Sequence, residues 1–228
     1  MSKIVAMIPA RMGSKRVENK NTRHLGGIPL ISHVIKATKE ANCFDEIYVN
    51  SESDILGDLA LEGGVSFYKR PPHLSSDTAT NDDFTHDFLT NIKCDYLIQI
   101  LPTSPFITTR EIKDFTQVMR SNDIDTLISV KDAQIECVYE GRPINFNPQK
   151  PTPPSQDLEP VQAYACALMG WKTSNFLYNM KDLGCAYHGG KGRVKFFTVK
   201  GFSEIDIDNE EDFLVAEAIY SYLNEKKN

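Results

Sequence analysis

A cluster of cationic side chains follows the first apolar segment of the chain. Five Lys or Arg residues and a single Glu lie between positions 11 and 23, so this segment carries a local charge of +4, whereas the whole chain carries −6. The preceding run Ile4–Ile8 predicts a buried strand. A cationic loop at the carboxyl end of a first strand suits a phosphorylated ligand, to which backbone N–H groups around Gly13 and Ser14 can donate. The cations available to neutralise phosphate oxygens are Arg11, Lys15 and Lys20.

A pair of carboxylates lies near the other end of the chain. The segment Glu204–Asp208 alternates between acidic and apolar residues, which predicts a strand with Asp206 and Asp208 on one face, about 7 Å apart along the backbone. Two carboxylates facing a phosphate loop can hold Mg²⁺ against a nucleotide. Taken alone, the pair fits equally well an acidic turn before a helix N-terminus.

Two further polar loops each follow a predicted strand. One contains Arg70 and the hydroxyl-rich stretch 75–80, and the other is Leu101–Pro105. Taken alone, each loop could equally be an ordinary surface loop or the start of a helix, without a functional role. Because strand ends of a doubly wound sheet line one crevice, the four segments together predict nucleotidyl transfer. In that reaction cations and a metal neutralise a triphosphate while a hydroxyl attacks in line.

Strand and helix patterns alternate along the first 130 residues and predict a mostly parallel, doubly wound α/β sheet in a single domain spanning 1–228. The residues from about 132 to 190 break this alternation and contain a Pro-rich stretch at 148–155, which predicts an inserted lobe, an interface or both. The predicted strands are Ile4–Ile8, Glu46–Asn50, Val65–Tyr68, Tyr96–Leu101, Thr126–Val130 and Val194–Val199. The predicted helices are Pro29–Asn42, Asp54–Leu61, Asn81–Ile92, one that begins at the capping box Thr108–Glu111, and Asn209–Leu223.

Composition narrows the function classes. The acidic balance argues against general nucleic-acid binding, and no apolar stretch approaches the ~20 residues that span a bilayer. The five cysteines form no CxxC pair and are expected to be reduced thiols, so we expect a cytoplasmic protein. The first loop matches neither the Walker phosphate loop nor the GxGxxG pattern of dehydrogenases. The histidines lack metal-ligand spacing, although His188 lies in a loop that could reach a partner's site.

Several stretches of the sequence resemble those of a known family. The stretches IPARMGSKRVENKN, RPPHLSSDTATNDDF, LPTSPF and EIDIDNEEDFLVAE are similar, in order and interval, to the signatures of the CMP-sugar synthetases, above all the CMP-N-acetylneuraminate cytidylyltransferases. The resemblance implies a Rossmann-like nucleotidyltransferase fold that uses CTP and Mg²⁺ to activate a 2-keto-3-deoxy sugar acid. It also implies a homodimer whose small inserted lobe is exchanged between subunits.

The resemblance assigns roles by position. It implies catalytic roles for Lys20, Arg11 and Asp208, with Lys20 stabilising charge at the α-phosphate, and a metal site at Asp206 and Asp208. The implied nucleotide-binding residues are Ala10, Arg11, Gly13, Ser14, Lys15, Asn21, Arg70 and Ser76. The implied sugar-side residues are Leu101, Thr103, Ser104 and Ala165.

Two sugar-side positions depart from the sialic-acid pattern. The family places Gln before PTSP, where this chain has Leu101, and an Asn-Gly-containing strand where this chain reads QAYACA from Gln162. Because an apolar Leu cannot replace an amide, another nonulosonic acid or an eight-carbon acid stays open as the acceptor. Two wider alternatives also stay open: a nucleotidyltransferase for another base or sugar, and a nucleotide-binding homologue without catalysis.

Overall fold

A computed structural model describes residues 2–121 and 123–226. The strands are β1 Ile4–Pro9, β2 His24–Leu25, β3 Ile28–Pro29, β4 Glu46–Ser51, β5 Ser66–Lys69, β6 Tyr96–Ile100, β7 Thr126–Ala133, β8 Val138–Tyr139, β9 Arg142–Pro143, β10 Val161–Lys172 and β11 Val194–Thr198. The α-helices are α1 Leu30–Ala41, α2 Asp54–Glu62, α3 Asn81–Asn91, α4 Thr109–Ser121, α5 Thr173–Leu183 and α6 Glu210–Glu225. Short 3₁₀ helices are η1 Pro72–Ser75, η2 Ser155–Asp157 and η3 Gly201–Glu204.

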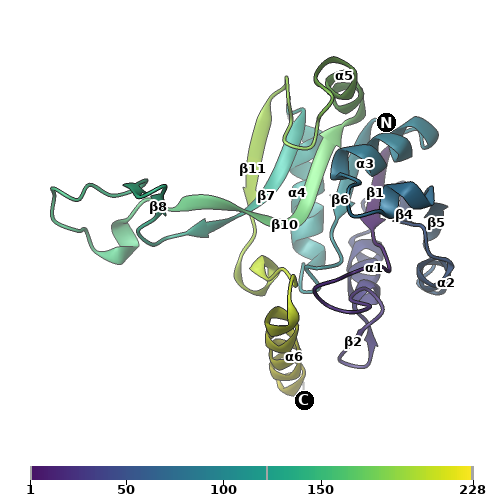
Figure 1. Cartoon of the computed structure of the whole chain (residues 1–228), viewed down its shortest axis with the longest axis horizontal. Coiled ribbons are helices and arrows are strands. Elements are labelled where there is room, and N and C mark those ends of the chain that lie inside the picture. The colour runs from purple at the N-terminus through teal and green to yellow at the C-terminus, as the bar shows by residue number, and fades with distance from the viewer. Residues whose placement is uncertain (1, 122, 227–228) are drawn as a thin grey trace.

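Seven strands form the central sheet in the order β11-β7-β10-β6-β1-β4-β5 (Figure 1). All neighbouring pairs are parallel except those of β10, which runs antiparallel to both β6 and β7. The predicted α/β architecture with a mostly parallel sheet is therefore confirmed. From β1 the chain builds outward through β4 and β5, then returns to place β6 on the other side of β1. This reversal of strand order creates a crevice between the carboxyl ends of β1 and β6.

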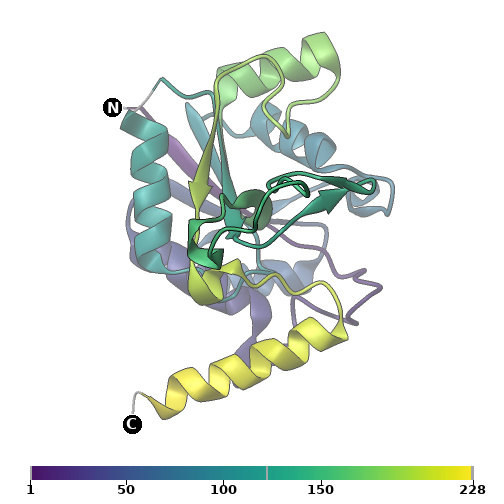
Figure 2. The same cartoon turned by 90° about the vertical axis from the view of Figure 1, so that its left-hand side faces the viewer.

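Helices cover both faces of the sheet, and α4 and α5 lie on opposite sides of it (Figure 2). One core packs Ile4, Ala6 and Ile8 of β1 against α1, α2 and α4. The other packs Val5 and Met7 of β1 against α3 and α5. Every residue of β1 is buried because both faces of the strand are covered, which explains its continuous apolar sequence. None of the helices in the described residues is long and apolar enough to cross a membrane.

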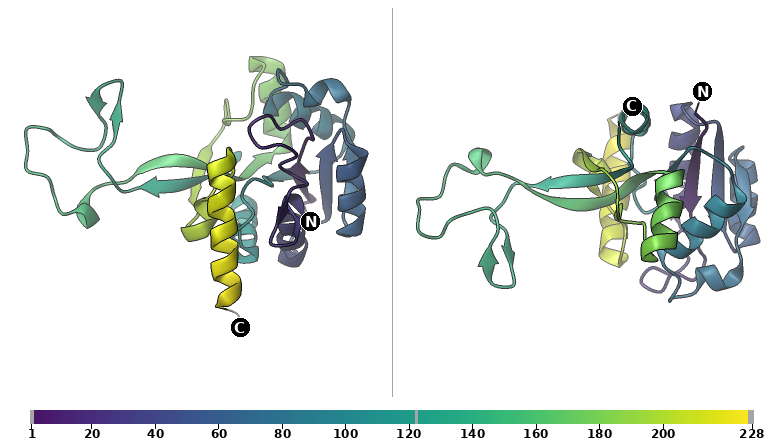
Figure 3. Two further views of the ribbon diagram at one scale, coloured as in Figure 1. Left: turned by 60° about the horizontal axis from the view of Figure 1, so that its bottom comes forward. Right: turned by 90° about the horizontal axis from the view of Figure 1, so that it is seen from above.

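The region predicted as an inserted lobe divides into two parts. Residues 134–160 leave the body as a long arm that continues the line of β7 and β10 (Figures 1 and 3). Val161–Lys172 instead returns to the sheet between β6 and β7, and α5 packs beside α3. The second half of the predicted range is thus part of the main domain. Its small and polar residues at 162–166 lie before a register shift in β10, which hides the strand pattern.

The predicted strand at Glu204–Asp208 is wrong. Gly201–Glu204 forms η3, and the residues from Ile205 to Asp208 are extended but join no sheet. The backbone N–H of Ile207 donates to the carbonyl oxygen of Thr103 at 2.8 Å, so this segment is held by the loop after β6 and not by a strand ladder. Its alternating pattern arises because Ile207 is buried in a small core under α6, whereas the two Asp side chains stay half-buried.

Candidate active site

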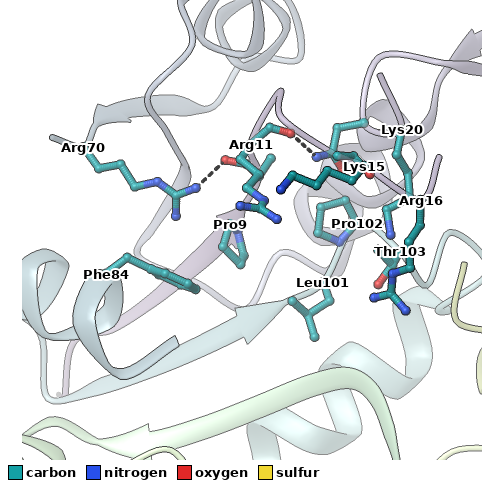
Figure 4. Close-up of a pocket in the computed structure, with 13 residues that line it drawn as sticks. Pro9, Arg11, Lys15, Arg16, Lys20, Arg70, Phe84, Leu101, Pro102 and Thr103 are labelled. Carbon is teal, nitrogen blue, oxygen red and sulfur yellow. Dashed lines mark hydrogen bonds between the residues drawn. The ribbon is translucent and has the colours of Figure 1, made fainter. Parts of the chain in front are cut away.

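A cavity of about 420 Å³ opens at the carboxyl ends of β1 and β6, at the crevice created by the strand order (Figure 4). Its walls come from the cationic loop, the segment after β5, the start of α3 and the turn after β6. The lining residues are Pro9, Ala10, Arg11, Ser14, Lys15, Arg16, Lys20, Asn21, Arg70, Phe84, Leu101, Pro102 and Thr103. The structure therefore brings together three of the four segments that the sequence singled out.

The fourth segment reaches the same cavity through Lys20. Val17, Ile207 and Phe213 pack in one small core, which joins the cationic loop to the chain just before α6. The Nζ of Lys20 donates to the carbonyl oxygen of Ile207 at 2.6 Å and lies 3.8 Å from Oδ1 of Asp208. Burial lowers the pKa of Lys20, although the charges of Asp208 and Asp206 oppose that shift.

Arg11 and Lys15 are paired with an acidic residue that the sequence did not single out. The Nη1 of Arg11 lies 3.2 Å from Oδ1 of Asp77 and from the carbonyl oxygens of Ser75 and Ser76. The Nζ of Lys15 lies 2.5 Å from the other Asp77 oxygen, and this hydrogen bond lowers the pKa of Asp77. An arriving phosphate would compete with the Asp77 carboxylate for the same two cations.

Arg70 is a fully buried cation at the cavity wall. It donates to the carbonyl oxygen of Ala10 at 2.9 Å and to the Ser75 hydroxyl at 2.8 Å, and it lies 3.6 Å from Glu52. Its guanidinium also stacks over the ring of Phe84, 4.8 Å from the ring centre. Its Nη1 has no hydrogen-bond partner among the described residues, so one donor remains for a ligand.

Asp206 and Asp208 are suited to a divalent cation. Oδ1 of Asp206 is buried and has no hydrogen-bond partner in the described part of the chain. Burial raises the pKa of the Asp206 carboxyl, a hydrogen bond from Thr103 opposes this, and the nearby Asp208 adds to it. No group of three or more His, Cys, Asp or Glu that could hold a metal occurs in residues 2–121 and 123–226. Mg²⁺ commonly uses one or two carboxylates together with substrate phosphates, so the pair fits that ion.

The remaining predicted residues divide between the cavity wall and its surroundings. Leu101 and Thr103 line the cavity, whereas Ser104 and Ala165 are buried and do not line it. Gly13 and Ser76 belong to the two loops that frame the entrance but are not lining residues, and Asn21 lines the wall and donates to the carbonyl oxygen of Arg11 at 2.9 Å. His188 contacts Tyr164 of its own chain through Nδ1 at 3.1 Å.

Three residues of the site were missed by the sequence reasoning. Phe84 lies in the helix predicted at Asn81–Ile92 and Asp77 in the hydroxyl-rich stretch 75–80, but neither residue type indicates a nucleotide site on its own. Glu52 accepts from the Met12 backbone N–H at 3.0 Å and from the Ser75 hydroxyl at 2.6 Å, so it ties both loops to Arg70. Its position directly after the strand Glu46–Ser51 was the available signal.

Comparison with known proteins identifies the family. A family model described as cytidylyltransferase matches residues 5–154. The chain belongs to that family. Over 135 residues, 58% of its length, the chain is 36% identical to an N-acylneuraminate cytidylyltransferase of Streptococcus agalactiae, of which the match covers 33%. It therefore spans about a third of the length of that relative.

Two other relatives are matched over a larger share of their own length. A CMP-N,N'-diacetyllegionaminic acid synthase of Legionella pneumophila is 36% identical over 51% of this chain and 53% of its own. The post-translational flagellin modification protein B of Campylobacter coli is 28% identical over 98% of this chain and 97% of its own. Among solved structures, a CMP:2-keto-3-deoxy-manno-octonic acid synthetase complexed with CTP superposes with a TM-score of 0.70 and 15% identity, covering 99% of this chain and 100% of that one. The predicted Rossmann-like nucleotidyltransferase fold is thereby confirmed.

Proposed function

We propose that this cytidylyltransferase transfers CMP from CTP to the anomeric hydroxyl of a 2-keto-3-deoxy sugar acid of the nonulosonate class. The hydroxyl oxygen forms a bond to the α-phosphorus, pyrophosphate leaves, and the hydroxyl proton is released. The observation that carries the proposal is the junction of a cationic loop with an acidic pair at one cavity, where Lys20 lies 3.8 Å from Asp208.

The residues of the cavity have different roles in this reaction. Arg11, Lys15 and Arg16 line the entrance and neutralise the triphosphate, while the more buried Lys20 stabilises charge at the α-phosphate. Arg70, stacked on Phe84, presents its free donor to the nucleoside. Asp206 and Asp208 would hold Mg²⁺, which when bound supplies positive charge that offsets the phosphates.

The acceptor is proposed as a sialic-acid-like nonulosonate other than N-acetylneuraminate itself. The named relatives act on N-acylneuraminate and on N,N'-diacetyllegionaminic acid, which share the nine-carbon keto-acid skeleton. Leu101 lines the cavity and gives its wall an apolar surface where an amide is expected for N-acetylneuraminate. An apolar wall favours an acceptor with additional acyl groups.

Pyrophosphate release tests the function directly. The purified protein would be incubated with Mg²⁺ and each of CTP, UTP, GTP and ATP, against a panel of sugar acids that includes N-acetylneuraminate, diacylated nonulosonates and an eight-carbon acid. We expect release with CTP and a nonulosonate, and its loss on chelation of the metal with EDTA. Equal release with several nucleotides, or none with CTP and any acid, would contradict the proposal.

A homodimer is also proposed, formed through the arm 134–160. The arm holds four strongly exposed apolar side chains within positions 135–144, and such a concentration is typical of an interaction surface. They are Ile135 at 64%, Val138 at 59%, Tyr139 at 66% and Ile144 at 53% exposure.

A reaction that consumes CTP is expected in the cytoplasm, and the five cysteines, all within the described residues and all free thiols, fit a reducing compartment.

Charged substitutions on the arm are expected to dissociate the dimer. Val138→Asp with Tyr139→Asp should shift the mass measured by light scattering from two chains to one, because each Asp would be desolvated at the interface. Leu61→Asp, at an equally exposed position on α2, is the matched control and should stay dimeric. A native protein of monomer mass, or an unchanged arm variant, would show that the arm serves another purpose.

A further inference from the structure

Gln99 is a buried amide with no hydrogen-bond partner. Its side chain is fully buried, and neither Nε2 nor Oε1 has a partner among the residues that the structure describes. A primary amide offers two donors and an acceptor, and nearly all such groups in protein interiors are satisfied. An amide left unsatisfied at the centre of a sheet therefore points to a partner that arrives later.

The position of Gln99 connects it to the cavity. In the sheet it lies between Met7 of β1 and Met169 of β10. Side chains two residues apart on a strand share a face and lie about 6.8 Å apart along it, so Gln99 shares a face with Leu101, as Met7 does with Pro9. Leu101 and Pro9 both line the cavity (Figure 4). Gln99 is therefore one layer beneath the cavity floor.

Asn50, which pairs with Pro9 in the sheet register, lies on the same face as Gln99, and its Oδ1 is likewise buried without a partner among the described residues. The core on this face is made of Val5, Met7, Phe88 and other apolar residues. The two flanking methionines are unbranched and flexible, so the amide has room to change rotamer. The Ser104 hydroxyl, in the turn that follows Leu101, is likewise buried and unpartnered among the described residues. Three buried side chains with unsatisfied polar atoms, Asn50, Gln99 and Ser104, thus lie behind the cavity wall.

We propose that Gln99 determines acceptor specificity by pairing with an acylamino group of the sugar acid. This inference rests on the proposed function. The amide donates from Nε2 to the acyl carbonyl oxygen, while Leu101 packs against the acyl methyl. A hydroxyl in place of the acylamino group lacks this carbonyl oxygen and leaves the Gln99 amide unpaired. Sites built to hydrogen-bond a substrate group discriminate strongly against analogues that lack it.

Kinetics with two acceptors test this role. Gln99→Leu would be compared with the native enzyme on an N-acylated nonulosonate and on the same acid with a hydroxyl in place of that acylamino group. We expect kcat/KM for the acylated acceptor to fall by about 10- to 100-fold, a size typical of a lost substrate hydrogen bond. The value for the hydroxyl acceptor should change less than about threefold. The KM for CTP should not change, and the Tm should be equal or higher because an unsatisfied amide is removed.

Met119→Leu is the matched control, since it changes a fully buried methionine of α4 in the core on the other face of the sheet without removing a polar group, and it should leave the ratio of the two acceptors unchanged. If Gln99→Leu does not fold, Gln99→Met provides an unbranched substitute of similar length. An unchanged acceptor ratio, or an equal loss for both acceptors, in an active enzyme would overturn the role of Gln99 alone. A native enzyme that releases no pyrophosphate from CTP with any acid would overturn the proposed function and this role together.

Discussion

Replacing Asp208 by Asn is expected to lower kcat for CMP transfer by about a thousandfold or more, while the protein stays folded. Asp208 is half-exposed and its contacts are ion pairs with Arg16 at 3.0 Å and Lys20 at 3.8 Å. The pair with Arg16 is exposed and contributes little to stability, about 0–1 kcal/mol. The more buried Lys20 keeps its hydrogen bond to the carbonyl oxygen of Ile207 when Asp208 is replaced. Its loss removes a carboxylate that the proposal assigns to Mg²⁺, so the effect should fall on turnover.

Asp206→Asn is expected to raise the stability of the ligand-free protein while it removes the activity. A carboxyl whose pKa is raised on folding contributes stability below its unfolded pKa and loses that contribution as the pH rises through its folded pKa. At neutral pH the ionised, partly buried Asp206 therefore weakens the ligand-free protein. Asp206→Asn should raise the Tm without ligand, yet abolish turnover. The added stability that Mg²⁺ and CTP give to the native protein should be absent in this variant.

Glu210→Gln is the control for both substitutions, because Glu210 lies two positions after Asp208 but pairs with Arg23 outside the cavity. Its activity should stay within about twofold of native, as is typical of surface substitutions away from a site. Near-native activity of Asp208→Asn would reject the metal assignment, whereas equal damage from Glu210→Gln would mean that the segment matters only as a structural support.

The sequence predicted those parts of the fold that depend on local patterns. The run at Ile4–Pro9 is apolar on both faces because it becomes a central strand. The capping box also forms as expected: the Thr108 backbone N–H donates to the Glu111 carboxylate at 3.0 Å, and the Glu111 backbone N–H donates to the Thr108 hydroxyl at 3.1 Å. Each of these features depends on residues a few positions apart. The alternation of such elements was enough to indicate the sheet and the edge at which a ligand binds.

Features set by pairing between distant segments were not predictable in this way. The local sequence of Val161–Lys172 does not indicate that this strand will insert antiparallel between β6 and β7. The segment Glu204–Asp208 has the alternating pattern of a strand because one of its residues, Ile207, is buried under α6. The pairing of Asp77 with Arg11 and Lys15 joins loops more than sixty positions apart. The unsatisfied amide of Gln99 is visible only once its neighbours are known.

Lys20→Met is expected to reduce kcat by about 10²–10³-fold with a small change in the KM for CTP, because a charge that acts mainly in the transition state is lost. Lys20 differs from the other loop cations in its burial, with a side chain only 12% exposed, and in its short bond to Ile207. Arg11 and Lys15 are already paired with Asp77 at the entrance, so their loss should raise KM more than it lowers kcat.

The pH dependence of the native enzyme provides the decisive comparison. Because burial lowers the pKa of Lys20, its ammonium loses a proton at lower pH than an ordinary lysine. The kcat/KM for CTP of the native enzyme, which reports the free enzyme, should therefore fall on the alkaline side below the usual lysine pKa, and the kcat/KM of Lys20→Met should lack that limb. Lys20→Arg, which keeps its charge throughout, should move the limb to higher pH. Lys36→Met, at an exposed position of α1, is the control and should keep the native profile. An alkaline limb that persists unchanged in Lys20→Met would assign the titration to another group and leave Lys20 a role in holding Ile207 and the acidic segment in place.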